Sequence, residues 1–428
     1  MAHKMISVDI FIECRGLESV DMTDPEAGNP GMGGSQYCFL MLAYFLDKFH
    51  RESFKIRIIS YEPLKLPSGI GNVVVSSLEE VLSVSRGSVL IMRQFNTIPP
   101  YDVVDRSPDS NIILWCHNFL FAEEAARISR AEAIKGVVFV SRQMYDFYAD
   151  HDIILKGTPI FNMVPDTDTP PRRIPVSPVI TFMGQISKGK GIITLLKIWE
   201  KVHRVHPDAI LNIIGKGNLY DRNTSVGPLG ITDEATEREM LPYITDPDGT
   251  LSRSIKFLGI LGKEKYEVFS NSTVGIVNPS SSTETFGMGI IEMASSSLPV
   301  VTRKWNGHPD TAIDGKTSLL ALSVSSMAHC VNRLIEDKEL NLKLGKEAKR
   351  QVARFAPETI VPQWARLIKN VASGSASFPL LAPSRPYWNN YKFLRYANRM
   401  LRHGLRLRFL PAVVDVETAA YGLLRKLR

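Results

Sequence analysis

The chain has little cysteine and no long hydrophobic run. Four of its 428 residues are cysteine, and no two of them have the Cys-x-x-Cys spacing of redox or zinc sites. No apolar stretch reaches the roughly 18 residues that a membrane-spanning helix needs. The first residues, MAHKMISVDIFIE, predict a strand and not a signal peptide, because Asp9 and Glu13 interrupt the apolar run. We therefore expect a cytoplasmic protein with reduced thiols.

Motifs of two other enzyme classes are missing or misplaced. No Gly-x-Gly-x-x-Gly follows the first predicted strand with an acidic residue about 20 residues later, which disfavours a dehydrogenase. Two Asp-x-Asp triplets occur, Asp166 with Asp168 in a proline-rich stretch and Asp246 with Asp248 in a polar insertion. A metal-dependent transferase would need such a triplet beside a strand, and neither triplet lies beside a predicted strand. We therefore expect neither to bind a metal, and we predict no cofactor.

The positive charge of the chain is concentrated at one end. The net charge is +7, and the segment from Arg385 to the end contains ten Lys or Arg and two acidic residues. That segment carries +8, so the preceding 384 residues carry about −1. The basic character belongs to the tail and not to the body of the protein.

Short apolar runs alternate with helical patterns, which predicts an α/β protein with parallel sheets. The runs ISVDIFI, FKIRIIS, SVLIMR, NIILWC and GVVFVS predict strands in the first half, and VITFMG, AILNIIG, IKFLG, VGIVNPS and LPVVT in the second. Two such series predict two Rossmann-like domains that face each other across a cleft. Ligands in such folds bind at the carboxyl ends of the strands.

A proline-rich stretch separates the two series and sets the predicted domain boundaries. Five prolines between Val164 and Val179 oppose regular structure and predict a linker. We predict an N-terminal domain over 1–165, the linker over 166–178, a C-terminal domain over 179–372 and a basic helical tail over 373–428. Residues 218–254 form a long polar stretch between two predicted strands. This stretch is either a functional loop or a surface insertion with one short helix.

The segment PSSSTETFGMGIIEMASSSLPVV contains two glutamates, Glu284 and Glu292, around a predicted strand-to-helix turn. The first turn of a helix presents N–H groups and a partial positive charge. The glycines Gly287 and Gly289 let a ligand approach the backbone closely. A sugar with a phosphate suits such a site, since a carboxylate accepts hydrogen bonds from hydroxyls. The alternative is that Glu284 caps the helix and Glu292 is merely exposed.

The wider context is similar to a known family. NPSSSTETFGMGIIEMASSSLPVVTRKWNGHPDTAIDGKTSLL resembles the donor-site signature of the retaining GT-B glycosyltransferases of family four, also called glycosyl transferases group 1. VITFMGQISKGKGIITLLKIWEKVHRVHPDAILNIIGKG resembles the first unit of that family's C-terminal domain. The resemblance covers most of residues 177–322, and it continues more weakly through GMGGSQYCFLMLAYFL, WCHN, VVFVSRQMYDFY and IFNMVP. It implies a GT-B fold.

The resemblance also implies roles for residues of the donor site. Glu284 would contact the transferred sugar and Glu292 the nucleotide ribose. Backbone amides around Phe286, Gly287 and Met288 would hold the sugar and phosphate. No metal is implied, and the co-substrate would be a nucleotide diphosphate-sugar.

The family neutralises the diphosphate with an arginine and a lysine, and this chain matches only the lysine. Lys190 stands at the lysine position, and Gln185 stands at the arginine position. Glutamine keeps a hydrogen-bond donor but has no charge, so the phosphates are stabilised less unless Lys188 or another cation substitutes. An ordinary surface lysine is the alternative for Lys190.

Three residues of the first half complete the implied site. Gly33 and Gly34 would form a loop that faces the donor phosphates, unless they belong to a plain flexible loop. His117, at the predicted carboxyl end of a strand, would lie near the reacting sugar or the acceptor. The alternative for His117 is a structural role.

These residues predict a retaining glycosyltransferase, of the hexosyltransferase type, with a glycan, a lipid-linked molecule or a small molecule as its acceptor. A nucleotide-sugar epimerase of the same fold is the nearest alternative. A catalytically degenerate nucleotide-sugar binding protein is another, because Gln185 replaces the arginine.

The basic tail has helical spacing. Its apolar positions are Phe393, Leu394, Ala397, Met400, Leu401 and Leu405, with Arg395, Arg399, Arg402, Arg406 and Arg408 between them. We expect the part up to about residue 400 to pack on the N-terminal domain with its arginines in water. For the remainder we expect contact with an anionic membrane surface, at the inner face of a membrane. Nucleic-acid binding is not expected, because no nucleic-acid module accompanies the charge.

Overall fold

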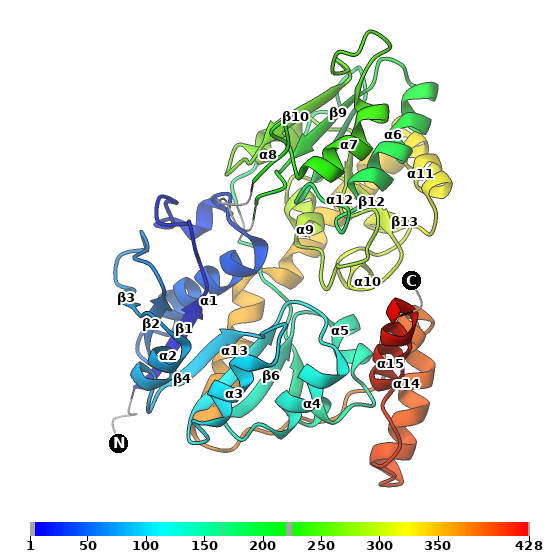
Figure 1. Cartoon of the computed structure of the whole chain (residues 1–428). Helices are drawn as coiled ribbons and strands as arrows, with labels where there is room; N and C mark the ends of the chain where they lie inside the picture. Colours follow the sequence, from blue (N-terminus) through cyan, green and yellow to red (C-terminus); the bar gives the residue numbers. More distant parts are fainter. Residues whose placement is uncertain (1–4, 166, 220–224, 427–428) are drawn as a thin grey trace. The chain divides into compact units, whose positions relative to one another are not determined.

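The computed structural model describes residues 5–165, 167–219 and 225–426. The described chain divides into two compact units. Unit one contains the residues up to Cys14, Cys38–Asn162 and those from Ile360 onward, and unit two contains Arg15–Tyr37 and Met163–Thr359. Each unit is built on one parallel sheet, with helices between most of the successive strands (Figure 1).

Unit one has a seven-stranded sheet in the order β3-β2-β1-β4-β5-β6-β7. Its strands are β1 (Ile6–Ile12), β2 (Phe54–Ser60), β3 (Gly71–Val74), β4 (Val89–Arg93), β5 (Asn111–Cys116), β6 (Ile134–Phe139) and β7 (Gly157–Pro159). Its helices are α1 (Gly34–His50), which begins in unit two, α2 (Leu78–Val84), α3 (Pro99–Asp105), α4 (Ala122–Arg130), α5 (Arg142–Phe147), α13 (Pro357–Ala372), α14 (Lys392–Arg399) and α15 (Val413–Lys426).

The acidic residue inside the first strand has a partner on the next strand. Asp9 is buried and opposite Arg57 in the β1–β2 register. Arg57 donates to both carboxylate oxygens of Asp9 at 2.8 Å. A bidentate pair of this kind offsets the cost of burying a carboxylate, which explains how the first strand tolerates Asp9.

Unit two has a six-stranded sheet in the order β10-β9-β8-β11-β12-β13. Its strands are β8 (Val179–Met183), β9 (Ile210–Ile214), β10 (Ile255–Gly259), β11 (Val274–Ile276), β12 (Val300–Arg303) and β13 (Ser318–Ala321). Its helices are α6 (Ile192–Val205), α7 (Glu234–Ile244), α8 (Lys265–Ser270), α9 (Met288–Ser295), α10 (His308–Thr311), α11 (Val324–Glu336) and α12 (Lys338–Val352). Short 3-10 turns lie at Pro25–Ala27, Asp152–Lys156, Ala353–Phe355 and Asn389–Tyr391.

The strand order of unit two reverses between β8 and β11. In doubly wound sheets, ligands bind beyond the carboxyl ends of the strands at such a reversal. The strands that flank it are buried mainly through apolar side chains, Ile180 and Phe182 on β8 and Val274 and Ile276 on β11, and Thr181 on β8 is a buried polar residue. The sheet therefore holds the loops that follow β8 and β11 next to each other.

The predicted α/β class with two parallel sheets is confirmed, and all ten predicted strands are present. Three short strands were not predicted: β3, β7 and β13, each of three or four residues. The run VGIVNPS forms a strand only over Val274–Ile276, because Asn278 adopts a left-handed backbone conformation with φ of 34°. Residues 15–37 and 360–372 group with the other unit than the one predicted for them.

The proline-rich stretch is held against unit two. The guanidinium of Arg172 donates to the carbonyl oxygens of Ser272 and Thr273, and at 2.7 Å to Oδ1 of Asn341. Asp166, a member of one acidic triplet and the first residue of the predicted linker, lies outside the described residues. In the polar insertion, the carboxylate of Glu237 accepts hydrogen bonds from the backbone N–H groups of residues 229, 231 and 232, and α7 follows.

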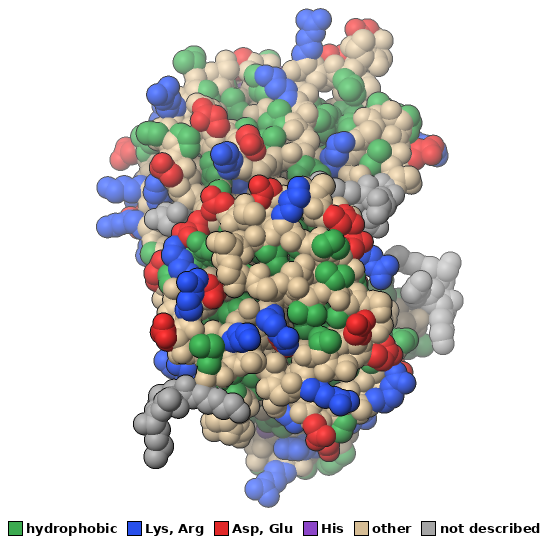
Figure 2. All heavy atoms as spheres, turned by 90° about the vertical axis from the view of Figure 1, so that its left-hand side faces the viewer, with side chains coloured by type: hydrophobic (Ala, Val, Ile, Leu, Met, Phe, Trp, Pro, Cys, Tyr) green, Lys and Arg blue, Asp and Glu red, His purple; other side chains and the backbone are tan. Residues whose placement is uncertain are grey.

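Among the described residues, no helix has the length and apolar character needed to cross a bilayer. Basic and acidic side chains are interspersed on the face of the molecule drawn in Figure 2, with no large area of one sign. This mixture agrees with the near-zero net charge of the chain before the tail. The tail itself corrects one prediction: Arg395 does not point to water but is buried. Arg402, in the part expected to contact a membrane, is buried as well.

Candidate active site

Lys190 and Glu284 meet at the point where the strand order of unit two reverses. Lys190 lies in the loop after β8, and Glu284 lies between β11 and α9. The Nζ atom of Lys190 is 3.0 Å from Oε2 of Glu284, and both side chains are largely buried. Two residues predicted for the donor site are thus adjacent, and Lys190 is not an ordinary surface lysine.

The carboxylate of Glu284 is surrounded by donors. Oε2 also accepts from Nδ2 of Asn278 at 3.1 Å, and Oε1 accepts from the backbone N–H of Gly287 at 3.0 Å. Burial alone raises the pKa of Glu284, but the charge of Lys190 and these hydrogen bonds outweigh it, and the pKa falls to about 2. Glu284 is therefore an anion at neutral pH and cannot serve as a general acid.

His308, at the start of α10, is a neighbour of this pair that the sequence analysis did not single out. Its ring is fully buried, with Nδ1 3.0 Å from the carbonyl oxygen of Arg303 and 3.1 Å from Oγ1 of Thr302. Burial lowers the pKa of His308 below its ordinary value, although the charge of Glu284 opposes this. A neutral His308 leaves Lys190 as the cation that balances Glu284 at neutral pH.

Strained backbone surrounds Glu284. Asn278, Ser281 and Asn306 have positive φ angles of 34°, 56° and 49°. Nδ2 of Asn306 donates to the carbonyl oxygen of Ser281 at 2.6 Å, so the two loops brace each other. Residues in such conformations cluster at functional sites, because the surrounding structure must compensate for the strain.

A glycine lets these loops come together. A Cβ atom on Gly307 would lie 2.2 Å from the carbonyl carbon of Thr285 and 2.5 Å from the backbone nitrogen of Phe286. The N–H of Gly307 donates to the carbonyl oxygen of Glu284 at 3.1 Å. The position of Glu284 therefore depends on a glycine that is 23 residues further along the chain.

Glu292 is buried and paired, not exposed. Its Oε1 atom is 2.6 Å from Nζ of Lys265, which belongs to α8. Burial lowers the pKa of Lys265, but the charge of Glu292 and the hydrogen bond between them raise it above its ordinary value. The amine of Lys265 is thus protonated at neutral pH, and the alternative of an exposed Glu292 is wrong.

The turn between the two glutamates is tightly packed. Gly287 precedes α9 with φ of 93°, and its N–H is already bonded to Glu284. Phe286 is buried against the ring of Phe355, and its carbonyl oxygen accepts from Oγ1 of Thr311 at 3.0 Å. Met288, the first residue of α9, is half-buried. Gly289 lets α9 approach the strands, since a Cβ there would lie 3.1 Å from Cε of Met183.

The side chains of Gln185 and Lys188 both interact with neighbouring residues. Nε2 of Gln185 donates to the carbonyl oxygen of Gly217 at 2.7 Å, which ties the loop after β8 to the loop after β9. Lys188 is exposed and forms an ion pair with Glu239 of α7. Lys188 therefore does not stand next to Glu284, where Lys190 is found.

Gly33 and Gly34 lie in an ordered loop of unit two. Oδ1 of Asn29 accepts from the N–H groups of Gly31 at 3.0 Å and Met32 at 2.9 Å, and the N–H of Gly33 donates to Oε1 of Gln36 at 3.2 Å. Gly34 begins α1. These hydrogen bonds do not support the alternative of a plain flexible loop.

His117 belongs to unit one, where it follows β5. Its N–H donates to Oε1 of Gln94 at 2.9 Å, and its ring packs at centroid distances of 4.8 Å from Trp115 and 5.6 Å from Phe39. Burial and the charge of Arg93 hold the pKa of His117 well below its usual range. The imidazole is therefore neutral at physiological pH.

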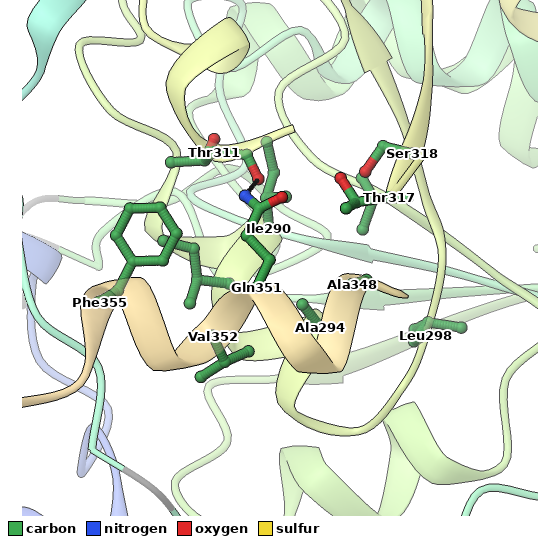
Figure 3. A pocket seen from close by; sticks show the side chains of 12 residues that line it. Ile290, Ala294, Leu298, Thr311, Thr317, Ser318, Ala348, Gln351, Val352 and Phe355 are labelled. Atoms are coloured by element: carbon green, nitrogen blue, oxygen red, sulfur yellow. Dashed lines mark hydrogen bonds between the residues drawn. The ribbon is translucent and has the colours of Figure 1, made fainter. Parts of the chain in front are cut away.

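A separate pocket lies between α9 and α12 (Figure 3). Ile290 and Ala294 of α9 line it together with Ala348, Gln351 and Val352 of α12. Nε2 of Gln351 donates to the carbonyl oxygen of Thr311 at 2.8 Å. The predicted donor-site residues are not among those that line this pocket. The pocket is a small gap in the packing of two helices. Within the described part of the chain, no three His, Cys, Asp or Glu side chains gather as metal ligands would.

The comparisons with known proteins support the assignment of this half of the chain. The family model described as Glycosyl transferases group 1 matches residues 172–351. Residues 172–351 belong to glycosyl transferases group 1. This group 1 domain contains Lys190, Gln185, Glu284, Glu292 and Lys265, and it makes up most of unit two.

The curated relatives match about half of this chain. D-inositol 3-phosphate glycosyltransferase of Corynebacterium kroppenstedtii is 24% identical over 222 residues, which are 50% of this chain and 46% of that protein. Trehalose synthase of Pyrococcus horikoshii is 24% identical over 210 residues, 49% of this chain and 46% of that protein. The chain therefore spans less than half the length of the curated relatives it matches.

Solved structures resemble most of the chain. Sucrose-phosphate synthase of Thermosynechococcus elongatus has a TM-score of 0.64 at 16% identity, covering 86% of this chain and all of that one. The Anabaena protein HepE, in complex with UDP and glucose, has a TM-score of 0.60 at 14% identity, covering 85% of this chain and all of that one. The protein has the GT-B fold.

Sequence reasoning missed Asn278, His308 and Lys265. Asn278 and His308 lie inside the quoted signature, but no periodicity marks them as neighbours of Glu284. Lys265 is 27 residues before Glu292 in KEKYEVFS, where it reads as one more charge in a polar helix start. Only the fold brings it against Glu292.

Proposed function

We propose that this protein is a retaining glycosyltransferase that moves a sugar from a nucleotide diphosphate-sugar to an acceptor hydroxyl. The observation that carries the proposal is the buried pair of Lys190 and Glu284 at the strand reversal of the group 1 domain. The names of the matched relatives denote enzymes that make or transfer glycosides, and HepE binds UDP and glucose, which also supports this donor class.

The pair supplies the two kinds of contact that such a donor needs. The ionised carboxylate of Glu284 accepts hydrogen bonds from sugar hydroxyls. The ammonium of Lys190 stabilises the negative charge that develops on the departing diphosphate. Since Lys190 is already held 3.0 Å from Glu284, it is positioned before the donor binds. No metal ion is required in this proposal.

The reaction proceeds on one face of the sugar. The bond between the anomeric carbon and the phosphate oxygen breaks, and the acceptor oxygen bonds to the same carbon from the same side. The departing phosphate takes the proton of the acceptor hydroxyl. Glu284, with a pKa of about 2, is too weak a base to take that proton.

The role of Glu292 follows from its pairing. In the proposal it binds the ribose hydroxyls of the nucleotide, and Lys265 fixes the direction of its carboxylate. The packed turn at Phe286 and Gly287 brings the first amides of α9 to the sugar and phosphate. His117, Gly33 and Gly34 are the proposed contributions of the preceding part of the chain. The acceptor is a glycan, a lipid-linked molecule or a small molecule.

Donor turnover by the full chain tests the proposal. The purified protein is incubated with UDP-, GDP-, ADP- and CDP-sugars, and nucleotide release and sugar transfer are measured, with the anomeric configuration of the product read by NMR. We expect one donor to be consumed, and Glu284→Gln to lower its turnover by about 10²- to 10³-fold. Glu336→Gln, at an exposed site of the same unit, is the matched control.

Three outcomes would contradict the proposal. Free epimer without glycosyl product would favour an epimerase. Donor binding without turnover would favour a degenerate binding protein, the alternative that Gln185 raises. An absence of binding, hydrolysis and transfer with all four donor classes would leave the proposal without support.

A further inference from the structure

The helix α14 has the opposite orientation from a usual amphipathic surface helix. Its buried basic residues face the protein, and its large aliphatic residues and Phe393 face solvent. Lys392 is 1% exposed and Arg395 is 0% exposed. Nζ of Lys392 is 2.9 Å from Oδ2 of Asp146, and the guanidinium of Arg395 donates to both carboxylate oxygens of Glu417 on α15. The helices α14 and α15 lie side by side (Figure 1).

The π-helical turn Met400–Gly404 continues this arrangement. Arg402 is 5% exposed, and its guanidinium lies 3.3 Å from Oδ1 of Asp152. The buried basic residues are thus each matched by a carboxylate of unit one. Breaking such pairs is costly, so they fix which side of the helix faces outward.

The outward side is apolar. Phe393 is 63% exposed, Leu394 46%, Met400 64% and Leu401 41%. These residues, with Ala397, occupy positions i, i+1, i+4, i+7 and i+8, which share one face of a helix. We call this set, together with Leu405 and Phe409 beyond it, the apolar face. Leu405 is 67% exposed and Phe409 is 81% exposed.

Single exposed hydrophobic residues are normal, but a contiguous face of large ones marks an interaction site. A second group of exposed apolar residues lies on α15, at Val416, Tyr421, Leu423 and Leu424.

Exposed cations and amphipathic aromatic residues border the apolar face. Arg406 and Arg408 are exposed between its last members, and Arg385 is exposed before α14. No acidic residue occurs between Glu358 and Asp415. Tyr387, Trp388 and Tyr391 are 50%, 44% and 56% exposed at the start of α14.

We propose that the apolar face and its arginines dock the protein onto an anionic lipid surface. Leucine and phenylalanine enter the boundary of the acyl chains, tyrosine and tryptophan lie at the level of the head groups, and arginines attract anionic lipids. A second copy of the chain fits less well, because a symmetric contact would bring the same arginines against each other. Nucleic acid also fits less well, because its affinity comes mainly from phosphate contacts, which exposed leucine and phenylalanine do not make. This docking does not depend on the proposed transferase activity.

Flotation of the full chain with vesicles tests the proposal. We expect the protein to float with vesicles of phosphatidylcholine and phosphatidylglycerol, and much less with phosphatidylcholine alone or at high salt. A triple variant, Phe393→Gln with Met400→Gln and Leu405→Gln, should reduce the bound fraction by roughly tenfold or more. The double variant Arg406→Gln with Arg408→Gln should reduce it on anionic vesicles only.

The matched control replaces three exposed apolar residues of unit two, Val176, Leu322 and Leu342, with glutamine, and should float like the native protein. Point variants are preferable to deletion of the tail, because deletion would remove Lys392 from the buried Asp146 and Arg402 from Asp152. A melting temperature within about 2 °C of the native value would establish that the triple variant is folded.

Equal flotation of the native protein and the folded triple variant would overturn the proposal. A native dimer in light scattering that the triple variant abolishes, without any vesicle binding, would overturn it in favour of a second copy. Salt-sensitive binding of a DNA duplex by the native protein, in the absence of vesicle binding, would also overturn it.

Discussion

Lys265 and Glu292 form a buried ion pair, with Nζ and Oε1 2.6 Å apart and the two side chains 4% and 8% exposed. The carboxylate that the family resemblance assigns to the ribose is therefore held by a lysine of another helix. Such a pair is stable only while both partners are present.

Removal of Lys265 alone should strongly destabilise the folded protein. Lys265→Met leaves Glu292 charged and buried without a cation, so we expect the free energy of unfolding to fall by about 3–5 kcal/mol. Urea unfolding measures this. The double variant Lys265→Met with Glu292→Gln should recover most of the loss of stability, but not the binding of the nucleotide. A double variant as unstable as the single one would show that the pairing is not the cause.

Lys190 and Glu284 should behave as a coupled unit in catalysis. We expect Lys190→Met and Glu284→Gln each to lower kcat/KM by about 10²- to 10³-fold, and the double variant to lose far less than the product of the two. The physical reason is that each residue positions the other. Steady-state kinetics of all four proteins measure the coupling, and independent effects that multiply would contradict it.

Gln185 offers a test by gain of function. Gln185→Arg adds a positive charge near the proposed phosphate position while it keeps a donor for the carbonyl oxygen of Gly217. We expect the nucleotide to bind roughly tenfold more tightly, measured by calorimetry with nucleoside diphosphates. Lys188→Gln, at the exposed pair with Glu239, should leave the affinity unchanged. Weaker binding by Gln185→Arg would indicate that this position is far from the phosphates.

Gly307→Ala should displace the backbone of the loop that carries Glu284. The added Cβ would lie 2.2 Å from the backbone of Thr285, so one of the two loops must move. We expect a loss of about 1–3 kcal/mol in stability and a larger fractional loss of activity, because the loop that moves carries Glu284. Gly422→Ala in α15, where a Cβ meets no atom within 4 Å, is the control. Full activity of Gly307→Ala would contradict the argument.

His117 should make stability depend on pH. Its pKa in the folded protein is well below 6.5, so the unfolded state binds more protons as the pH falls below 6.5. The stability that neutral His117 contributes is present above pH 6.5 and is lost below it, at up to about 1.4 kcal/mol per pH unit. Unfolding curves from pH 7.5 to 5.5 measure this slope, which should be smaller in His117→Gln and unchanged in the exposed His329→Gln. Equal slopes in all three proteins would assign the slope to other groups.

The sequence by itself determined the two parallel sheets and the identity of the group 1 domain. Strands such as Ile6–Ile12, Phe54–Ser60 and Ile255–Gly259 were predicted with the correct bounds, because apolar runs of that length have few other ways to be buried. Glu284 and Lys190 were found from a local pattern that resembles a family motif. Short strands such as β7 were missed, since three residues carry little periodicity.

The tertiary structure alone decided which charges are paired and which side of a helix is buried. Lys265 reaches Glu292, and Gly307 supports Glu284, across distances in sequence that no local pattern spans. The tail is the clearest case. Its spacing predicts a helix with an apolar side and a basic side, and the expectation was that the apolar side packs on the protein. Asp146, Asp152 and Glu417 reverse this, because carboxylates on the receiving surface make the basic side the one that can be buried.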